Sequence, residues 1–253
     1  MTRFLQFMKN NILNFIYGKQ GLPRAVNGHL FRIIPEKRWY FSPEYDRPVA
    51  SYFAKRISPG DLCVSIGANM GIYPLMFSGW NKPDGLVIAG EPNPESCELL
   101  DRHVRLNKLE NRVKIIRKAI SSKPGRATFH ASKADGMSRL GMPNPLLDGK
   151  THEIEVEVIN LDSLFLGVSS PVGALMMDIE GFEIAALQGG LHFLKSHLAK
   201  AIVIEMHPNA WDMAGTTRAD FEQILIDCGL KAVSLSGQID ALAEYGHIGL
   251  EPV

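Results

Sequence analysis

The chain has 253 residues, with 27 Lys and Arg against 27 Asp and Glu, so its formal net charge at pH 7 is zero. A chain of this length can bury a sizeable core, and one α/β domain accounts for it. The charge balance lacks the basic footprint of nucleic-acid-binding proteins, so no nucleic-acid partner is expected. Three cysteines without metal-ligand spacing indicate a reducing compartment, expected to be the cytoplasm, no disulfide framework and no metal site.

The N-terminal part, residues 1–58, is expected to form a helical and β extension that packs on a catalytic domain over residues 59–253. Residues 4–17 are apolar but interrupted by Asn and Lys, and they lack the small-residue cleavage site of a signal peptide. They predict an amphipathic helix that packs on the core or on a partner chain of an oligomer, with contact to a membrane surface as the alternative. No run of about 18 apolar residues occurs, so no transmembrane segment is expected.

Strands and helices alternate through the middle of the chain. Apolar runs predict strands over residues 61–66, 86–90 and 113–118, and amphipathic spacing predicts helices over residues 72–78 and 94–107. Pro74 fits the first turn of its helix, and Asn93 caps the next helix with Pro94 at the first helical position. Alternation of this kind is typical of a parallel sheet.

A longer segment breaks this alternation. Residues 126–130 predict a short strand, and residues 153–158 alternate at period two, as in a strand with one buried face. Residues 131–150 between them are rich in Gly, Pro and Met, and a loop of this length commonly has a function. We expect the segment to cover the cofactor or the substrate, with a disordered loop as the alternative.

The alternation then resumes and completes the sheet. Strands are predicted over residues 173–177, 201–204, 232–235 and 247–250. Helices are predicted over residues 182–198, interrupted at Gly189 and Gly190, and from the capping residues Thr217 and Asp220 to Gly229. The expected fold is therefore an α/β, doubly wound, mostly parallel Rossmann-like sheet, in which ligands bind at the carboxyl ends of the strands.

A glycine-rich turn over residues 65–71 joins the first predicted strand to the first helix. Glycine lets a backbone approach a nucleotide closely because it has no Cβ. Glu91 stands 20 residues after Gly71, at the tip of the second strand, where a carboxylate can accept hydrogen bonds from a ribose diol. The two features together predict an adenosine cofactor.

The residue types in this turn favour one adenosine cofactor. A nicotinamide enzyme requires G-x-G-x-x-G, in which the middle glycine admits the pyrophosphate, but Asn69 occupies that position. S-adenosylmethionine has no pyrophosphate and needs only one such turn. The turn therefore favours S-adenosylmethionine, and an NAD-dependent oxidoreductase of the Rossmann type is the alternative.

Five short motifs follow one another along the chain. They are GANMG at residues 67–71, EPNP at 91–94, VINLDSL at 158–164, MDIEGFE at 177–183 and IVIEMH at 202–207. In their order and spacing the chain resembles the FkbM-type methyltransferases, over roughly residues 39–235. The resemblance implies a class I methyltransferase fold, S-adenosylmethionine as cofactor, and O-methylation of a hydroxyl on a sugar, glycolipid or polyketide-like natural product. The expected cofactor-binding residues are Ser65, Gly67, Ala68, Asn69, Gly71, Glu91, Pro92, Asn93 and Asp178.

Two positions depart from the usual pattern of this family. The pattern usually has Asp where this chain has Ser65, and Lys where this chain has Met176. The resemblance implies that an acid at the tip of the first strand organises the turn and helps to hold the amino group of the cofactor. Serine supplies hydrogen bonds to the turn but no charge. A catalytically inactive binding protein of the same fold is therefore a further alternative.

Methyl transfer requires alignment and, for a hydroxyl acceptor, a base. The sulfonium methyl is already electrophilic, so the protein has to align the nucleophile and remove its proton. Candidate bases at the strand ends are Asp178, Glu180, Glu183, Glu205 and His207. His207 is the predicted base because an imidazole titrates nearest neutrality, and Asp178 and Glu180 are expected to orient a small-molecule, glycan-linked or lipid-linked acceptor.

Structural roles are the alternatives for the same residues. Asp178 and Glu180 are placed to cap the helix that begins near residue 182, and Glu183 is placed to brace its start. Glu205 and His207 are close enough in sequence to pair with each other. In each of these roles the side chain stabilises the fold and takes no part in methyl transfer.

Overall fold

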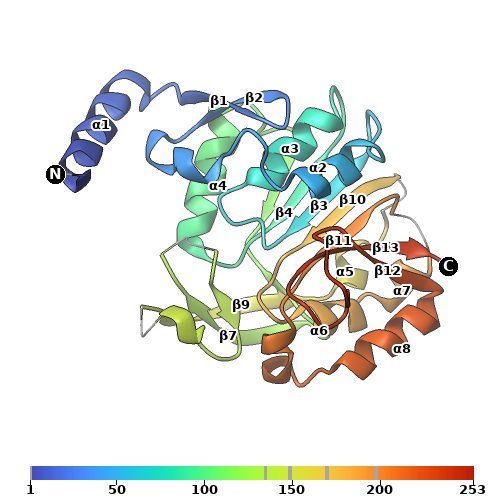
Figure 1. Cartoon of the computed structure of the whole chain (residues 1–253). Helices are drawn as coiled ribbons and strands as arrows, with labels where there is room; N and C mark the ends of the chain where they lie inside the picture. Colours follow the sequence, from blue (N-terminus) through green and yellow to red (C-terminus); the bar gives the residue numbers. More distant parts are fainter. Residues whose placement is uncertain (1, 134–135, 148–149, 169–170, 197–198) are drawn as a thin grey trace.

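The computed structural model describes residues 2–133, 136–147, 150–168, 171–196 and 199–253. A seven-stranded sheet runs through the centre with helices on both faces (Figure 1), in the strand order β12-β13-β11-β10-β3-β4-β5. The strands are β3 (Leu62–Ile66), β4 (Val87–Gly90), β5 (Val113–Ile116), β10 (Val172–Met177), β11 (Ile202–Met206), β12 (Leu230–Ser234) and β13 (Gly246–Pro252). β5, β4, β3, β10 and β11 pair in parallel, which confirms the doubly wound, mostly parallel sheet.

One strand of the central sheet runs against its neighbours. β13 lies between β11 and β12 and pairs antiparallel with both of them. The sequence predicts both terminal strands but not this direction, because the direction of a short strand depends on the connection that precedes it. The carboxyl ends of β3, β4, β10 and β11 remain on one common edge of the sheet.

A second, four-stranded sheet has the order β6-β9-β7-β8 and faces this edge. Its strands are β6 (Ala119–Ile120), β7 (Gly125–Ala131), β8 (Arg139–Leu140) and β9 (His152–Ile159). Val156 and Val158 of β9 are buried and the glutamates beside them are exposed, as the period-two pattern predicts. The predicted loop over residues 131–150 contains β8 and the 3-10 helix η2 (Pro145–Leu147), while its residues 134–135 and 148–149 lie outside the described residues.

The helices of the catalytic part are α3 (Ile72–Trp80), α4 (Pro94–Leu106), α5 (Leu161–Leu164), α6 (Glu183–Gln188), α7 (Leu191–Lys195), the 3-10 helix η3 (Pro208–Ala214) and α8 (Arg218–Cys228). All except α5 and η3, which the sequence does not predict, correspond to predicted helices, of which residues 197–198 lie outside the described residues. Gly189 and Gly190 separate α6 from α7, at the interruption predicted within residues 182–198. A Cβ at Gly189 would lie 2.6 Å from the carbonyl oxygen of Ser121, so a larger residue does not fit this turn.

The N-terminal residues form α1 (Thr2–Tyr17), the antiparallel hairpin of β1 (Leu22–Val26) and β2 (His29–Ile33), the 3-10 helix η1 (Pro35–Tyr40) and α2 (Arg47–Ala54). Phe31, Phe41 and Phe53 are buried in one apolar cluster with Phe77 of α3. The hairpin and α2 therefore pack on the catalytic part, whereas α1 extends from it beside η1 (Figure 1). Among the described helices, none combines the length and the apolar character needed to cross a bilayer.

Candidate active site

A cavity opens at the carboxyl ends of β3, β4 and β10, where the second sheet faces the central one. It contains about 580 Å³ of space, part of which is open to solvent. Five of the residues predicted to bind the cofactor line it, namely Gly67, Asn69, Glu91, Pro92 and Asp178. The cavity therefore lies where doubly wound sheets bind their ligands.

The glycine-rich turn after β3 is held against the neighbouring strands. Gly67 has a φ of +74°, and a Cβ there would lie 1.7 Å from the carbonyl oxygen of Asp178. The N–H groups of Gly67 and Ala68 donate to the carbonyl of Gly90 at 2.9 and 3.0 Å. Gly71 has a φ of +98°, and a Cβ there would lie 2.5 Å from a leucine side chain of α4. Glycine is required at both positions, because a side chain would clash and the backbone angle is unfavourable.

Glu91 follows β4 and is 6% exposed. Its Oε2 accepts a hydrogen bond from the N–H of Asn69 and its Oε1 accepts one from the N–H of Asn93, both at 2.8 Å. Burial raises the pKa of Glu91 to about 7, against the lowering effect of these two hydrogen bonds. Each carboxylate oxygen keeps a lone pair for a further donor, which suits the two hydroxyls of a ribose.

Four of the predicted cofactor residues are not among the described residues that line the cavity: Ser65, Ala68, Gly71 and Asn93. Ser65 is buried inside β3, and Ala68 and Gly71 shape the turn. The Oδ1 of Asn93 accepts a hydrogen bond of 3.0 Å from the first turn of α4, and its Nδ2 donates one of 2.8 Å to the carbonyl of Ser132. Asn93 therefore connects the end of β4 to the segment that follows β7.

The opposite wall of the cavity is predicted only in part from the sequence. This wall consists of Lys118, Ala119, Ile120 and Phe129, together with Gly136, Ser138, Arg139 and Leu140. Ile120 and Phe129 are buried and apolar, which suits a flat heteroaromatic ring. Residues 118–120 follow β5, so only their position after a strand of the central sheet could have indicated that they line the cavity. Gly136, Ser138, Arg139 and Leu140 belong to the segment over residues 131–150, which is expected to cover the cofactor, and they line the cavity.

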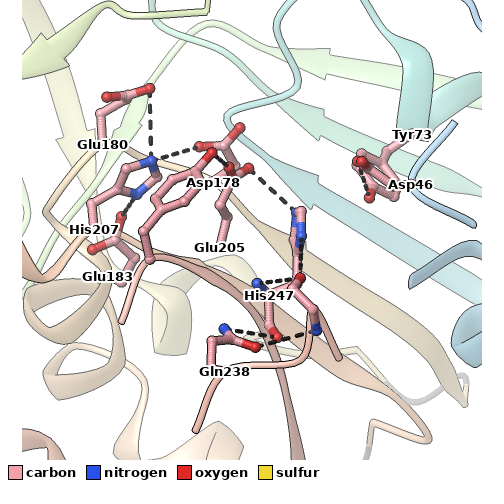
Figure 2. A network of polar contacts seen from close by, with 11 residues as sticks. Asp46, Tyr73, Asp178, Glu180, Glu183, Glu205, His207, Gln238 and His247 are labelled. Atoms are coloured by element: carbon pink, nitrogen blue, oxygen red, sulfur yellow. Dashed lines mark hydrogen bonds and ion pairs between the residues drawn. The ribbon is translucent and has the colours of Figure 1, made fainter. Parts of the chain in front are cut away.

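Carboxylates converge on the ring of His207, which follows β11 (Figure 2). The Nδ1 of His207 donates a hydrogen bond of 2.8 Å to Oε1 of Glu183. Its Nε2 lies 3.8 Å from Oε1 of Glu180 and 4.0 Å from Oδ1 of Asp178. The three residues predicted to be catalytic, Asp178, Glu180 and His207, are thus brought together beside the cavity that Asp178 lines.

Glu183 is completely buried and holds the imidazole in place. Its Oε1 also accepts a hydrogen bond of 2.8 Å from the N–H of Gly181, and its Oε2 accepts one of 3.2 Å from the indole of Trp211. Glu183 therefore braces the turn before α6 and also orients the ring. The N-terminus of α6 receives no hydrogen bond from a capping side chain, so the alternative in which Asp178 or Glu180 caps it is wrong.

Glu205 has other partners. The hydroxyl of Tyr245 donates to its Oε1, and Nε2 of His247 lies 3.4 Å from its Oε2 (Figure 2). The alternative in which Glu205 pairs with His207 is wrong, because the Nδ1 of His207 is bound to the carboxylate of α6. Burial alone would raise the pKa of Glu205, but its interactions with His247 and Tyr245 outweigh burial and lower the pKa to about 2.

The charges in this cluster change the pKa values of its members. Burial alone would lower the pKa of His207, but the hydrogen bond to Glu183 and the nearby carboxylates raise it to about 9. Burial, followed by the charge of Glu205, raises the pKa of Asp178 well above its usual range. Burial also raises the pKa of Glu180. The cluster therefore favours positive charge at its centre.

The sequence between β3 and β12 matches a known family. A family profile described as the methyltransferase FkbM domain covers residues 65–232, which is more than half of the chain. The chain belongs to the FkbM methyltransferase family. The cofactor of this family is S-adenosylmethionine, which confirms the cofactor that the turn predicts and sets the nicotinamide alternative aside.

The fold of this FkbM family member is shared with a solved methyltransferase structure. The FkbM methyltransferase of Methylobacillus flagellatus KT is 18% identical with a TM-score of 0.52, over 85% of this chain and 52% of that chain. The chain thus spans about half the length of that protein. Fibrillarin of Aeropyrum pernix, solved with S-adenosylmethionine, is 13% identical over 92% of this chain and 83% of that chain, with a TM-score of 0.47.

A putative methyltransferase of Streptococcus mutans, SMU.1697c, was solved with SAH. It is 8% identical over 82% of this chain and 97% of that chain, with a TM-score of 0.48. A search of curated proteins found no match to the chain.

Proposed function

We propose that this FkbM family member transfers the methyl group of S-adenosylmethionine to a hydroxyl of a sugar, a glycolipid or a polyketide-like natural product. The main support is that Asp178 belongs both to the cavity wall and to the cluster around His207, whose Nε2 lies 4.0 Å from Oδ1 of Asp178. A proton acceptor beside the cofactor is what the methylation of an alcohol requires.

On the cofactor side, we assign the ribose diol to Glu91 and the adenine to the apolar wall of Ile120 and Phe129. Gly67 and Asn69 allow the turn to approach the rest of the cofactor, and Asp178 borders the end that carries the methyl group. Pro92 adds a rigid part of the wall. The remaining predicted residues act by shaping the turn and the end of β4: Ser65, Ala68, Gly71 and Asn93.

On the acceptor side, we propose His207 as the base. Glu183 accepts the Nδ1 hydrogen bond, so the proton lost as the pH rises toward the pKa of about 9 comes from Nε2, which faces Asp178 and Glu180 (Figure 2). The neutral ring then offers its Nε2 lone pair as the base, and the rate is expected to rise with pH up to this pKa. The two carboxylates accept hydrogen bonds from hydroxyl groups and thus orient an acceptor that carries several of them. A general base of this kind contributes about 10²–10⁴-fold to the rate.

The acceptor is proposed to be a small molecule or a glycan- or lipid-linked compound. Carboxylates around the acceptor position repel the phosphates of a nucleic acid. Ile12, Phe15 and Ile16 of α1 are exposed, with Phe15 at 93%, which suits contact with a membrane that carries a lipid-linked acceptor. The three cysteines are free and buried, which supports a reducing compartment such as the cytoplasm.

The experiment is a transfer assay with S-adenosylmethionine that carries a deuterated methyl group. Candidate acceptors are saccharides, glycolipids, polyketides, carboxylic acids and RNA, and mass spectrometry locates the label. We expect the label on a hydroxyl oxygen. The variant His207→Ala should lose about 10²–10⁴-fold in turnover. The variant His152→Ala, in an exposed position on β9, is the matched control and should keep full turnover.

Two results would contradict the proposal. A label found only on carboxylates, amines or RNA would refute the hydroxyl acceptor. Binding of S-adenosylmethionine without transfer to any acceptor class would instead favour a catalytically inactive member of the family.

A further inference from the structure

We propose that Asp178, Glu180 and His207 bind one divalent metal ion beside the cofactor cavity. The sequence analysis expects no metal, because these residues show no metal-ligand spacing along the chain. The fold nevertheless brings one possible ligand atom from each residue to within 4.8 Å of the other two. The ligands come from the ends of the neighbouring strands β10 and β11, which a local sequence motif does not reveal.

The distances within the cluster are too long for direct hydrogen bonds and are also longer than those between two ligands of one bound ion. Nε2 of His207 lies 3.8 Å from Oε1 of Glu180 and 4.0 Å from Oδ1 of Asp178. Two ligands at 2.1 Å from one ion are about 3.0–3.4 Å apart at octahedral or tetrahedral angles. To reach this range, Glu180 has to approach Nε2 of His207 by about 0.4–0.8 Å and Asp178 has to approach it by about 0.6–1.0 Å, which adjustments of the torsions of both side chains allow.

The polar atoms at the centre of this cluster are not held by hydrogen bonds to any residue that the structure describes. The side chain of His207 is only 9% exposed, and its Nε2 contacts Glu180 and Asp178 at ion-pair distances of 3.8 and 4.0 Å, which are too long for hydrogen bonds. The Oδ1 of Asp178 is shielded from solvent and likewise has no hydrogen-bond partner among the described residues. A buried polar atom without a hydrogen bond costs free energy, and an ion bound between Oδ1 and Nε2 would supply the missing interaction.

The surroundings of His207 match those of a metal-binding histidine. A ligating imidazole commonly donates its other N–H to a carboxylate, which fixes the ring and leaves the lone pair for the metal. The 2.8 Å hydrogen bond from Nδ1 to the buried Glu183 supplies this arrangement. Arg139, whose charge acts on Glu180, directs two of its hydrogen bonds to the carbonyls of Met142 and Pro143 instead.

The ligand types narrow the choice of ion. Imidazole favours transition metals, whereas carboxylates favour harder cations such as Mn²⁺ and Mg²⁺. One imidazole and two carboxylates therefore suit a first-row divalent ion with open positions for an acceptor oxygen, and Mn²⁺ is the probe that accepts both ligand types. Asp178 also lines the cofactor cavity, so an ion held by the three residues would lie beside it.

The inference rests on the proposed function in one respect, which is the role of the ion. An acceptor hydroxyl bound to the ion becomes more acidic. Its proton leaves to solvent water, its oxygen forms the new bond to the methyl carbon, and the bond from sulfur to that carbon breaks to release S-adenosylhomocysteine. In the loaded enzyme His207 is then a ligand, because one lone pair cannot bind both the ion and the proton.

The test is a titration of metal-free protein with MnCl₂, followed by the electron paramagnetic resonance signal of free Mn²⁺. We expect one ion per chain. Glu180→Gln and His207→Ala should each weaken binding at least tenfold. The matched control Glu155→Gln removes an exposed carboxylate on β9 and should bind Mn²⁺ like the wild type. Retained binding of S-adenosylmethionine by Glu180→Gln shows that the variant is folded.

The outcomes separate this inference from the proposed function. No Mn²⁺ binding, or binding that Glu180→Gln and His207→Ala leave unchanged, would overturn the metal site. If transfer to a hydroxyl then proceeds after treatment with a chelator, the proposed function stands with His207 as the base. Binding of Mn²⁺ that the variants weaken supports the metal site even if no hydroxyl acceptor is methylated.

Discussion

Ser65 on β3 and Met176 on β10 lie side by side in the parallel register of the central sheet. Both are 1% exposed. These are the two positions at which the family pattern usually has Asp and Lys, so the two departures form one matched pair. Because both residues of this chain are neutral, the pair leaves no buried charge without a partner. The fold thus accommodates both departures at once.

Ser65→Asp alone is expected to destabilise the protein. The new carboxylate would be buried opposite Met176, and an uncompensated buried charge typically costs about 3–5 kcal/mol. The free energy of unfolding, measured by urea denaturation, should fall by this amount. The double variant Ser65→Asp, Met176→Lys should recover most of the loss. A single variant as stable as the wild type would show that the pairing is unimportant.

Glu91→Gln is expected to weaken the binding of S-adenosylmethionine. Hydrogen bonds to a charged group contribute about 1.5–3 kcal/mol, which corresponds to roughly 10–150-fold in the dissociation constant. Gln keeps the shape of the side chain but places an NH2 group against the N–H of either Asn69 or Asn93, so circular dichroism has to verify that the fold is retained. An unchanged dissociation constant would remove Glu91 from the ribose site.

The affinity for S-adenosylmethionine is expected to rise with pH around neutrality. Burial raises the pKa of Glu91 to about 7, and the ribose hydroxyls donate best to the ionised carboxylate. Below this pKa the cofactor has to displace a proton, so its binding weakens as the pH falls. Dissociation constants measured between about pH 6 and pH 8 check this dependence. The same slope in Glu91→Gln would assign it to another group.

Gly67→Ala is expected to disrupt the turn. The added Cβ would lie 1.7 Å from the carbonyl oxygen of Asp178, and the φ of +74° is unfavourable for alanine. Backbone strain alone costs on the order of 1–3 kcal/mol, so stability and cofactor binding should both fall. Gly125→Ala is the control, because a Cβ there meets no atom within 4 Å. Calorimetric binding equal to the wild type in Gly67→Ala would contradict this account of the turn.

The sequence reveals those parts of the site that depend on local patterns. The turn at Gly67, the acid Glu91 and the polar residues after β10 and β11 each follow a strand that apolar periodicity predicts. Contacts across the fold are different, because they depend on register and packing. The hydrogen bond between Glu183 and His207 joins residues 24 positions apart, and no local pattern indicates it.

The same limit applies to the rest of the cavity. Ile120 and Phe129 belong to a second sheet whose position over the cofactor edge depends on how the two sheets pack. The pairing of Ser65 with Met176 depends on strand register, which a buried apolar strand does not reveal. The kinds of residue at a site can therefore be predicted from single sequence motifs, whereas the residues that each of them contacts are known only from the folded structure.

Calorimetric titration of the wild-type chain with S-adenosylmethionine, and separately with NAD, tests the central claim most directly. The account predicts one S-adenosylmethionine per chain, bound in the cavity beside Glu91 and Asp178, and no heat from NAD. Parallel titration of Glu91→Gln links the heat to this cavity. Binding of NAD, or no binding of S-adenosylmethionine by a folded chain, would contradict the account.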